Sequence, residues 1–127
     1  MKKTFLFLML ITILLASCGN STPPAADTTK NFLQALSDKD DALMLSYVCA
    51  DYELEALLEF DAFALVQTTL TDLDCQQKEM DGDDALIICK GSIDATYNNE
   101  VRNFHLSERT YRVVQQGGDW LVCGYTK

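Results

Sequence analysis

The chain has 127 residues, 48% of them hydrophobic, with 19 acidic side chains against 10 basic ones. This is enough apolar material for one domain with its own core. The net charge of −9 argues against nucleic acid as a partner, because nucleic-acid binding depends on neutralising phosphates. It also argues against a domain that lies flat on anionic headgroups. A cationic partner would explain the charge, and so would solubility alone.

The N-terminus has the layout of an export signal. Lys2 and Lys3 precede an apolar run from Phe5 to Leu15, interrupted only by Thr12. A run of about eleven residues is well short of the roughly 20 that span a bilayer. The sequence therefore predicts a signal peptide rather than a transmembrane helix.

The signal ends in LASC, residues 15–18, which resembles the lipobox of bacterial lipoproteins. The resemblance implies a signal peptide over residues 1–17, cleavage before Cys18, and acyl chains such as palmitate on the mature Cys18. Acyl chains contribute about 0.8 kcal/mol per buried CH2, so two or three hold a small domain on a membrane. We expect a lipoprotein of the bacterial cell envelope, anchored to a membrane with its domain outside the cytoplasm. A plain secretory signal is the alternative. Cleavage would leave eight basic side chains against 19 acidic ones, a net charge of −11.

Residues 18–27 are predicted to be the lipidated cysteine and a tether rich in Ser, Thr and Pro, and residues 28–127 the folded domain. Three amphipathic helices come first in the domain, because apolar residues recur at helical spacing. We expect all three stripes to face the core. The first contains Phe32, Leu33 and Leu36, and the second Leu43, Met44, Tyr47 and Val48. The third, over residues 52–67, contains Leu54, Leu57, Leu58, Phe60, Phe63 and either Leu65 or Val66.

After Thr68 the hydrophobic period changes to two, which predicts four strands, over residues 70–80, 85–97, 101–115 and 119–125. Short turns rich in Asp, Asn and Gly separate them, as in an antiparallel meander. Helices followed by strands predict an α+β fold, with the helices packed on a four-stranded sheet. The first turn, DGDD at residues 81–84, invites a calcium interpretation, but it lacks the ligand spacing of an EF-hand loop, so a hairpin turn is favoured.

The turns also fix strand registers. A turn centred on Gly82 pairs Cys75 with Cys89, which puts these cysteines within reach of a disulfide. Cys49 and Cys123 are then paired by elimination, in a bridge that would tie the helices to the sheet. Free buried thiols and a metal site are the alternatives, although the cysteine spacing contains no CxxC motif.

The same registers place Leu73 opposite Gly91, Ile93 opposite Phe104 and Val114 opposite Leu121. They gather one coherent apolar face across the four strands, and we expect the helices to cover it. The members of this face are Leu73, Cys75, Ile87, Cys89, Ile93, Phe104, Leu106, Val114, Leu121, Cys123 and Tyr125.

Two segments carry a family resemblance. FLQALSDKDDA, residues 32–42, resembles the opening of NTF2-like (cystatin-like, α+β cone) domains, where a helix ends at a short polar break before the next. RVVQQGGDWLVCG, residues 112–124, resembles their last hairpin. The resemblance covers about residues 27–127 and is strongest to small bacterial lipoproteins with such domains. It implies a curved sheet around a long helix, a pocket between them, and often dimers formed through the sheet.

Charged and apolar residues on the two sheet faces suggest sites. Glu108 and Arg112 fall on the predicted inner face near Tyr125, where they could line the mouth of a pocket. A local salt bridge is the favoured interpretation for the charged residues. The outer face is more apolar than a solvated face should be, which predicts an interface or, as the alternative, coverage by the N-terminal segment. It would be centred on Trp120, with Tyr111 and His105 nearby and with Leu86, Ile88, Val101, Val113 and Val122 as its apolar material.

The sequence contains no motif for nucleophilic catalysis and no phosphate-binding loop. We assign no catalytic residue, and we expect no metal and no cofactor. The prediction is a non-catalytic domain that binds a partner protein, either an envelope protein or a second copy, or a small apolar ligand. The alternative is a small-pocket enzyme, an isomerase or hydrolase, that acts on a small organic substrate through titratable groups in a dry cavity.

Overall fold

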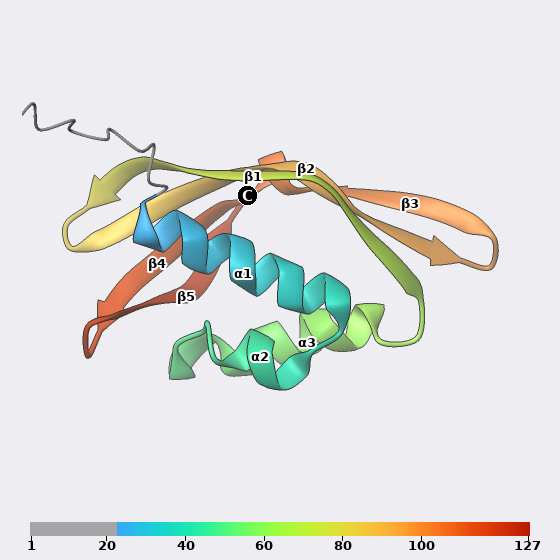
Figure 1. The fold of residues 1–127 in the computed structure, drawn as a ribbon, viewed down its shortest axis with the longest axis horizontal. Coiled ribbons are helices and arrows are strands. Elements are labelled where there is room, and N and C mark those ends of the chain that lie inside the picture. Colours follow the sequence, from blue (N-terminus) through green and yellow to red (C-terminus); the bar gives the residue numbers. More distant parts are fainter. Residues whose placement is uncertain (1–22) are drawn as a thin grey trace, which may run out of the picture.

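The computed structural model describes residues 23–127, in which helices precede an antiparallel sheet (Figure 1). The α+β fold class is therefore confirmed. Cys18 and the predicted signal peptide lie outside the described residues. Within residues 23–127, no helix is long and apolar enough to cross a membrane. The elements are α1 (Pro24–Asp38), α2 (Asp41–Leu45), the short 3-10 helix η1 (Ala50–Tyr52), α3 (Glu53–Phe63), β1 (Gln67–Asp81), β2 (Asp84–Tyr97), β3 (Glu100–His105), the 3-10 helix η2 (Leu106–Glu108), β4 (Thr110–Gln116) and β5 (Asp119–Thr126).

Helix α1 begins earlier than the sequence predicts. Pro24 occupies its first turn, where the missing N–H of proline is no loss. Ala25 and Ala26 directly behind it are buried, so the first turn already belongs to the core. The tether expected over residues 18–27 therefore ends by Pro23.

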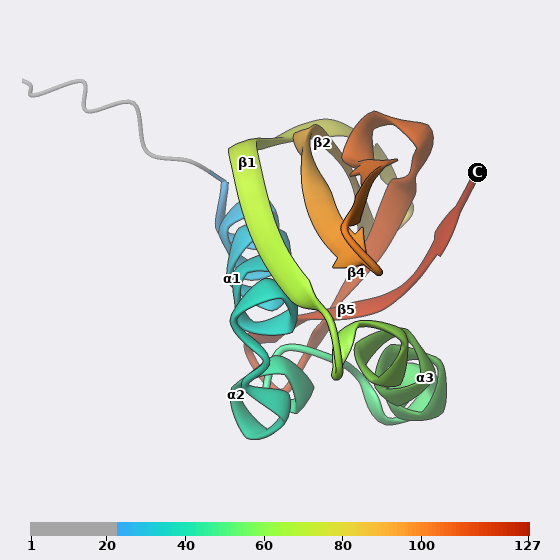
Figure 2. The same ribbon diagram turned by 90° about the vertical axis from the view of Figure 1, so that its right-hand side faces the viewer.

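The residues of the polar break after α1 end this helix and begin the next one. Lys39 adopts a left-handed conformation with φ of 61° and ends the helix, and the Asp40 N–H donates back to the Ala35 carbonyl at 3.0 Å. The Asp40 carboxylate then accepts from the Leu43 N–H at 3.0 Å and caps α2. This turn sends the chain from under the sheet into the second row of helices, α2 and α3 (Figure 2).

The third helical segment differs from its prediction in length and orientation. It consists of η1 and α3, and only Ala56 and Phe63 of α3 are buried. Leu54 and Leu58, expected in the core, are 68% and 62% exposed. Apolar residues occur around the whole helix, so the sequence pattern does not identify the inward side.

The sheet has five strands rather than the four of the predicted meander. Its order is β1-β2-β4-β5, and β3 pairs with the second half of β2. The predicted third strand is divided by η2 into β3 and β4, which pair with successive halves of β2. Helix α1 runs along one side of this sheet, and its Phe32 ring packs against Tyr111 with ring centroids 6.4 Å apart (Figure 1).

The insertion of η2 reverses the predicted faces of β4. Leu106 and Tyr111 are both buried although five positions separate them, which continuous strand alternation cannot give. Tyr111 and Val113 therefore lie in the core and Arg112 is exposed, opposite to the prediction. Val122 on β5, paired with Val113, is also buried.

Two bulges change the strand registers. The register of β1 against β2 shifts between Thr71 and Asp74, so Leu73 and Gly91 are not paired. A Cβ on Gly91 would lie 2.3 Å from the Thr71 carbonyl oxygen, so only glycine fits beside this bulge. On β5 the register shifts at Cys123 and Gly124, which places Tyr125 opposite Tyr111.

Both disulfides join the cysteine pairs that the sequence favours. Cys75 and Cys89 are paired across β1 and β2 with Cα atoms 4.0 Å apart. Cys49, after α2, is bonded to Cys123 on β5 with Cα atoms 5.3 Å apart. Residues 23–127 thus carry both bridges and a continuous core of buried side chains.

Candidate functional site

A hollow among the described residues lies between the η1–α3 segment and the end of β5. It is an open pocket of about 730 Å³. Tyr52 and Leu58 line its helical side and Tyr125 its sheet side, while Glu59 and Arg109 lie at its base. This volume is in the range of small-molecule sites.

Arg109 reaches the pocket because of the turn before it. Its N–H donates to the Leu106 carbonyl at 3.1 Å, closing η2, so that its side chain points beneath the sheet toward α3. The guanidinium lies over the Tyr125 ring, with Cζ 4.2 Å from the ring centroid. This geometry is a cation–π contact.

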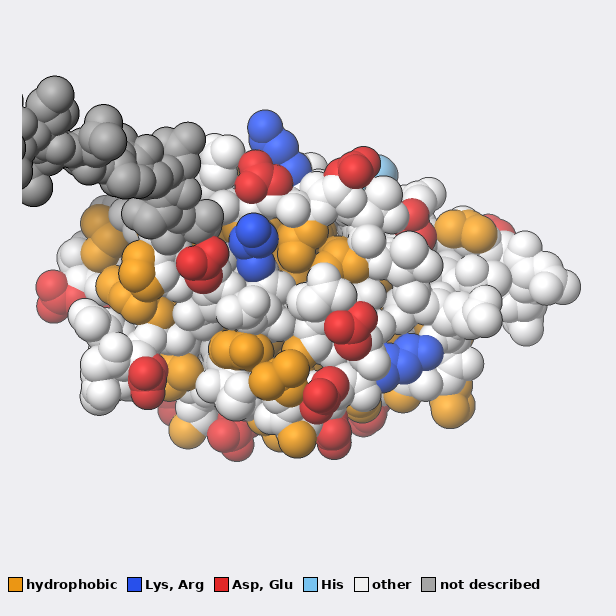
Figure 3. Space-filling model, in the orientation of Figure 1, with side chains coloured by type: hydrophobic (Ala, Val, Ile, Leu, Met, Phe, Trp, Pro, Cys, Tyr) orange, Lys and Arg blue, Asp and Glu red, His pale blue; other side chains and the backbone are white. Residues whose placement is uncertain are grey.

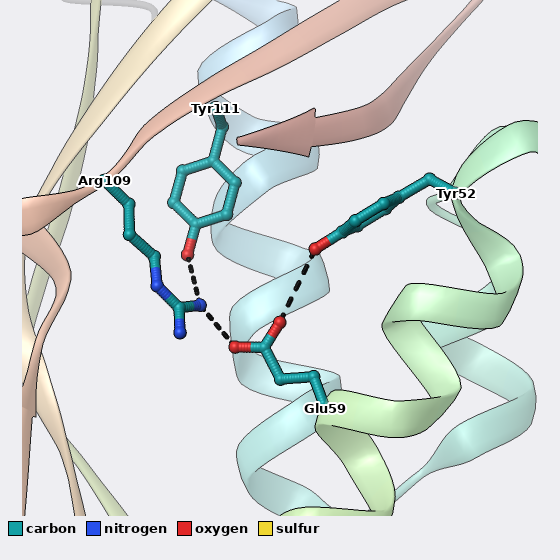
Figure 4. A network of polar contacts seen from close by, with 4 residues as sticks. All are labelled: Tyr52, Glu59, Arg109 and Tyr111. Atoms are coloured by element: carbon teal, nitrogen blue, oxygen red, sulfur yellow. Dashed lines mark hydrogen bonds and ion pairs between the residues drawn. The ribbon is translucent and has the colours of Figure 1, made fainter. Parts of the chain in front are cut away.

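Glu59 comes from the inward side of α3, on the same stripe as Ala56 and Phe63. Its carboxylate forms an ion pair with Arg109, and the two side chains are 13% and 17% exposed. Figure 4 shows Glu59 between Tyr52 and Arg109. The Tyr52 hydroxyl donates to Glu59 at 3.5 Å, and Arg109 donates to the Tyr111 hydroxyl at 3.4 Å.

Three groups of this cluster have raised pKa values. Burial, reinforced by the Glu59 carboxylate, raises the pKa of Tyr52 well above its usual range. Burial also raises the pKa of Tyr111, to about 12. For Arg109, burial opposes the charge, but the Glu59 carboxylate and Tyr111 together outweigh burial and the pKa is raised. The tyrosines thus remain hydroxyl donors and Arg109 remains a cation at neutral pH.

The three residues predicted to line a pocket lie in three different places. Tyr125 lines the 730 Å³ pocket. Glu108 lies on η2 beside a smaller neighbouring cavity of about 70 Å³. Arg112 points to the other side of β4 and forms an ion pair with Asp84 at 2.9 Å, which is the salt-bridge interpretation.

The structure removes Tyr111 from the interface predicted on the outer sheet face. Tyr111 is fully buried against α1, so its assignment to an exposed surface is wrong. Trp120 is half-buried and packs against the core cluster. His105 is exposed at the end of β3 and lines the smaller cavity.

Sequence reasoning did not find Glu59 or Arg109. A signal for Glu59 exists, since it is the charged member of a helix stripe that otherwise contains Tyr52, Ala56 and Phe63, and charges on a buried face are rarely without a partner. Arg109 carries no comparable signal, because its direction depends on η2.

Among residues 23–127, no group of His, Cys, Asp or Glu is placed to hold a metal ion. The DGDD segment forms the tight turn between β1 and β2, with Gly82 at φ of 61°. In comparisons with known proteins, no family model matches the chain and no curated relative is found.

Proposed function

We propose that this protein is a lipid-anchored lipoprotein of the bacterial envelope whose NTF2-like domain binds a small ligand without catalysing its conversion. The anchor rests on the lipobox resemblance at Cys18. The family proposal rests on the two sequence segments and is compatible with helices packed on one side of an antiparallel sheet.

The observation that carries the binding function is the pocket between α3 and β5. Its wall combines the apolar surfaces of Tyr52, Leu58 and Tyr125 with the polar Glu59–Arg109 pair. Binding sites typically have this composition, in which apolar surface supplies affinity and a few fixed polar groups supply orientation.

Binding is favoured over catalysis by the protonation states. General acid–base catalysis needs groups that exchange protons near the working pH. The resolved shifts in the pocket cluster move the pKa values of Tyr52 and Tyr111 away from neutrality and stabilise the charge on Arg109. These groups are therefore suited to hold a ligand rather than to move a proton.

A small ligand is also favoured over a protein partner. The protein-interface hypothesis depends on an apolar outer sheet face, but Tyr111, Val113 and Val122 of that face are buried in the core. Because these three side chains are not exposed, the pocket is the better-supported recognition surface.

The binding function is tested by native mass spectrometry of the domain from Gly19 to Lys127, purified from an oxidising compartment. A retained small molecule is expected in the wild-type protein. Leu58→Trp should abolish retention, because Leu58 lines the pocket and its exposure leaves room for the indole. Leu54→Trp is the matched control, since Leu54 is equally exposed on the same helix but does not line the pocket. Equal retention by both variants would contradict a ligand in this pocket.

The anchor is tested separately on the full chain. Wild-type protein should partition into the membrane fraction and carry acyl chains on its N-terminal cysteine. Cys18→Ser should remove both properties. Membrane association that survives this substitution would contradict the lipid anchor.

A further inference from the structure

The charges around the pocket are unevenly compensated. Arg109 contributes little net charge because Glu59 neutralises it at the base of the pocket. Asp51 on η1 and Glu55 on α3 also line the pocket, and within residues 23–127 neither forms a salt bridge. Lys127 is the remaining cation of the lining. The mouth of the pocket therefore presents two carboxylates that lack an ion-pair partner.

An apolar side chain lies beside these carboxylates. Leu58 lines the pocket but is 62% exposed, and the Tyr52 ring lies in the wall next to it. Figure 3 shows the opposite side of the molecule, over α1 and α2, where acidic and apolar side chains also lie side by side along the lower edge. An apolar group placed over Leu58 would cover surface that otherwise contacts water.

The net charge of the domain is negative, like the two carboxylates at the mouth of the pocket. Residues 23–127 contain all 19 acidic side chains and eight basic ones, so an anion approaches against a net charge of −11. An organic anion could use the Lys127 ammonium and the remaining donors of Arg109, but the Glu59 carboxylate lies next to Arg109 and two further carboxylates line the pocket. The net charge of the domain and the three carboxylates against two cations in the pocket lining both favour a cation.

We infer that the pocket selects an organic cation, an amine joined to an apolar body, with the ammonium group between Asp51 and Glu55 and the apolar body against Leu58 and Tyr52. The inference rests on the proposed binding function. It adds the sign of the ligand's charge, which the volume of the pocket alone does not determine.

The test uses three probes with one body and different charges: 3-phenylpropylamine, 3-phenylpropanol and 3-phenylpropanoate. Each is titrated into the Gly19–Lys127 domain at pH 7, with affinity read from chemical-shift changes of amides around the pocket. We expect the amine to bind about fivefold or more tightly than the alcohol, and the carboxylate to bind most weakly. The advantage of the amine should fall with added salt, because the carboxylates at the mouth are exposed to solvent.

Asp51→Asn/Glu55→Gln should remove the preference for the amine and leave the affinity for the alcohol unchanged. The control Glu79→Gln/Asp83→Asn removes the same charge at the β1–β2 hairpin and should leave the preference intact. Alcohol or carboxylate binding at least as tight as that of the amine would overturn the cation inference while retaining the pocket as a binding site. If none of the probes shifted pocket resonances at 10 mM, the binding function and the inference would both be overturned.

Discussion

Glu59 on α3 and Arg109 before β4 form an ion pair across 50 positions of sequence, and this pair joins the outer row of helices to the sheet. Both side chains are mostly removed from water, so each partner depends on the other for compensation of its charge. The same pair forms the base of the proposed ligand pocket. Fold stability and the proposed ligand recognition would therefore be coupled at one contact.

Glu59→Gln should lower the free energy of unfolding by about 1–2 kcal/mol, because it leaves the Arg109 cation partly buried without a counter-charge. Asp84→Asn is the matched control, since it breaks the Arg112–Asp84 pair, whose side chains are 55% and 25% exposed. That change should have an effect of less than about 1 kcal/mol. Urea unfolding measures both, and equal losses would contradict a special role for the Glu59–Arg109 pair.

Stability should fall with rising pH above about pH 10. The pKa of Tyr111 is raised by burial to about 12, so the folded protein keeps a proton that the unfolded chain releases near pH 10. The resulting loss approaches about 2–3 kcal/mol by pH 12. Urea midpoints between pH 9 and pH 11.5 should decline less steeply in Tyr111→Phe than in the wild-type protein. Identical slopes would contradict the raised pKa.

Removing the Cys49–Cys123 bridge should destabilise the domain more than removing Cys75–Cys89. The two bridges connect residues 74 and 14 positions apart, for which chain entropy gives about 4.4 and 3 kcal/mol. Unfolding of the double alanine variants measures the difference. A larger effect from the Cys75–Cys89 variant would show that native-state contacts, rather than loop length, dominate.

Gly91→Ala should lower the free energy of unfolding by about 2–4 kcal/mol, because the new methyl group would collide with the Thr71 carbonyl at the β1 bulge. Gly82→Ala separates this clash from backbone strain. Gly82 also has positive φ, but no atom lies within 4 Å of its added Cβ, so about 1–2 kcal/mol is expected. If the two losses were similar, the close approach of β1 to Gly91 would be unimportant.

Much of the sheet follows from turn chemistry. The pairs Ile93–Phe104 and Val114–Leu121 have the predicted registers, because a hairpin turn fixes every pair that follows it until a bulge intervenes. Cys75–Cys89 is also paired as predicted, but here a bulge between Gln77 and Glu79 offsets a turn that lies one position away from the predicted one. The interruption at η2 was not predictable in the same way. Leu106-Ser107-Glu108 contains neither Gly nor Pro, and it continues an alternating apolar pattern.

The pocket could not be predicted from the sequence, because two of its side chains have orientations that the sequence pattern does not indicate. The orientation of Arg109 requires η2, and the inward position of Glu59 requires knowledge of which side of α3 is buried. Leu54, Leu57, Leu58 and Phe60 surround that helix, so hydrophobic periodicity favours no side. The sequence therefore predicts the layers of the fold better than the contacts between α3 and the sheet.

The early start of α1 limits how far the domain can move from a lipid anchor. Only five residues separate Cys18 from Pro24, where the folded core begins. A fully extended chain of that length reaches about 20 Å. With acyl chains on Cys18, the domain would be confined to a thin layer next to the headgroups. Lengthening the segment between Cys18 and Pro24 with added Gly and Ser residues would alter the height of the domain above the membrane without disturbing its fold.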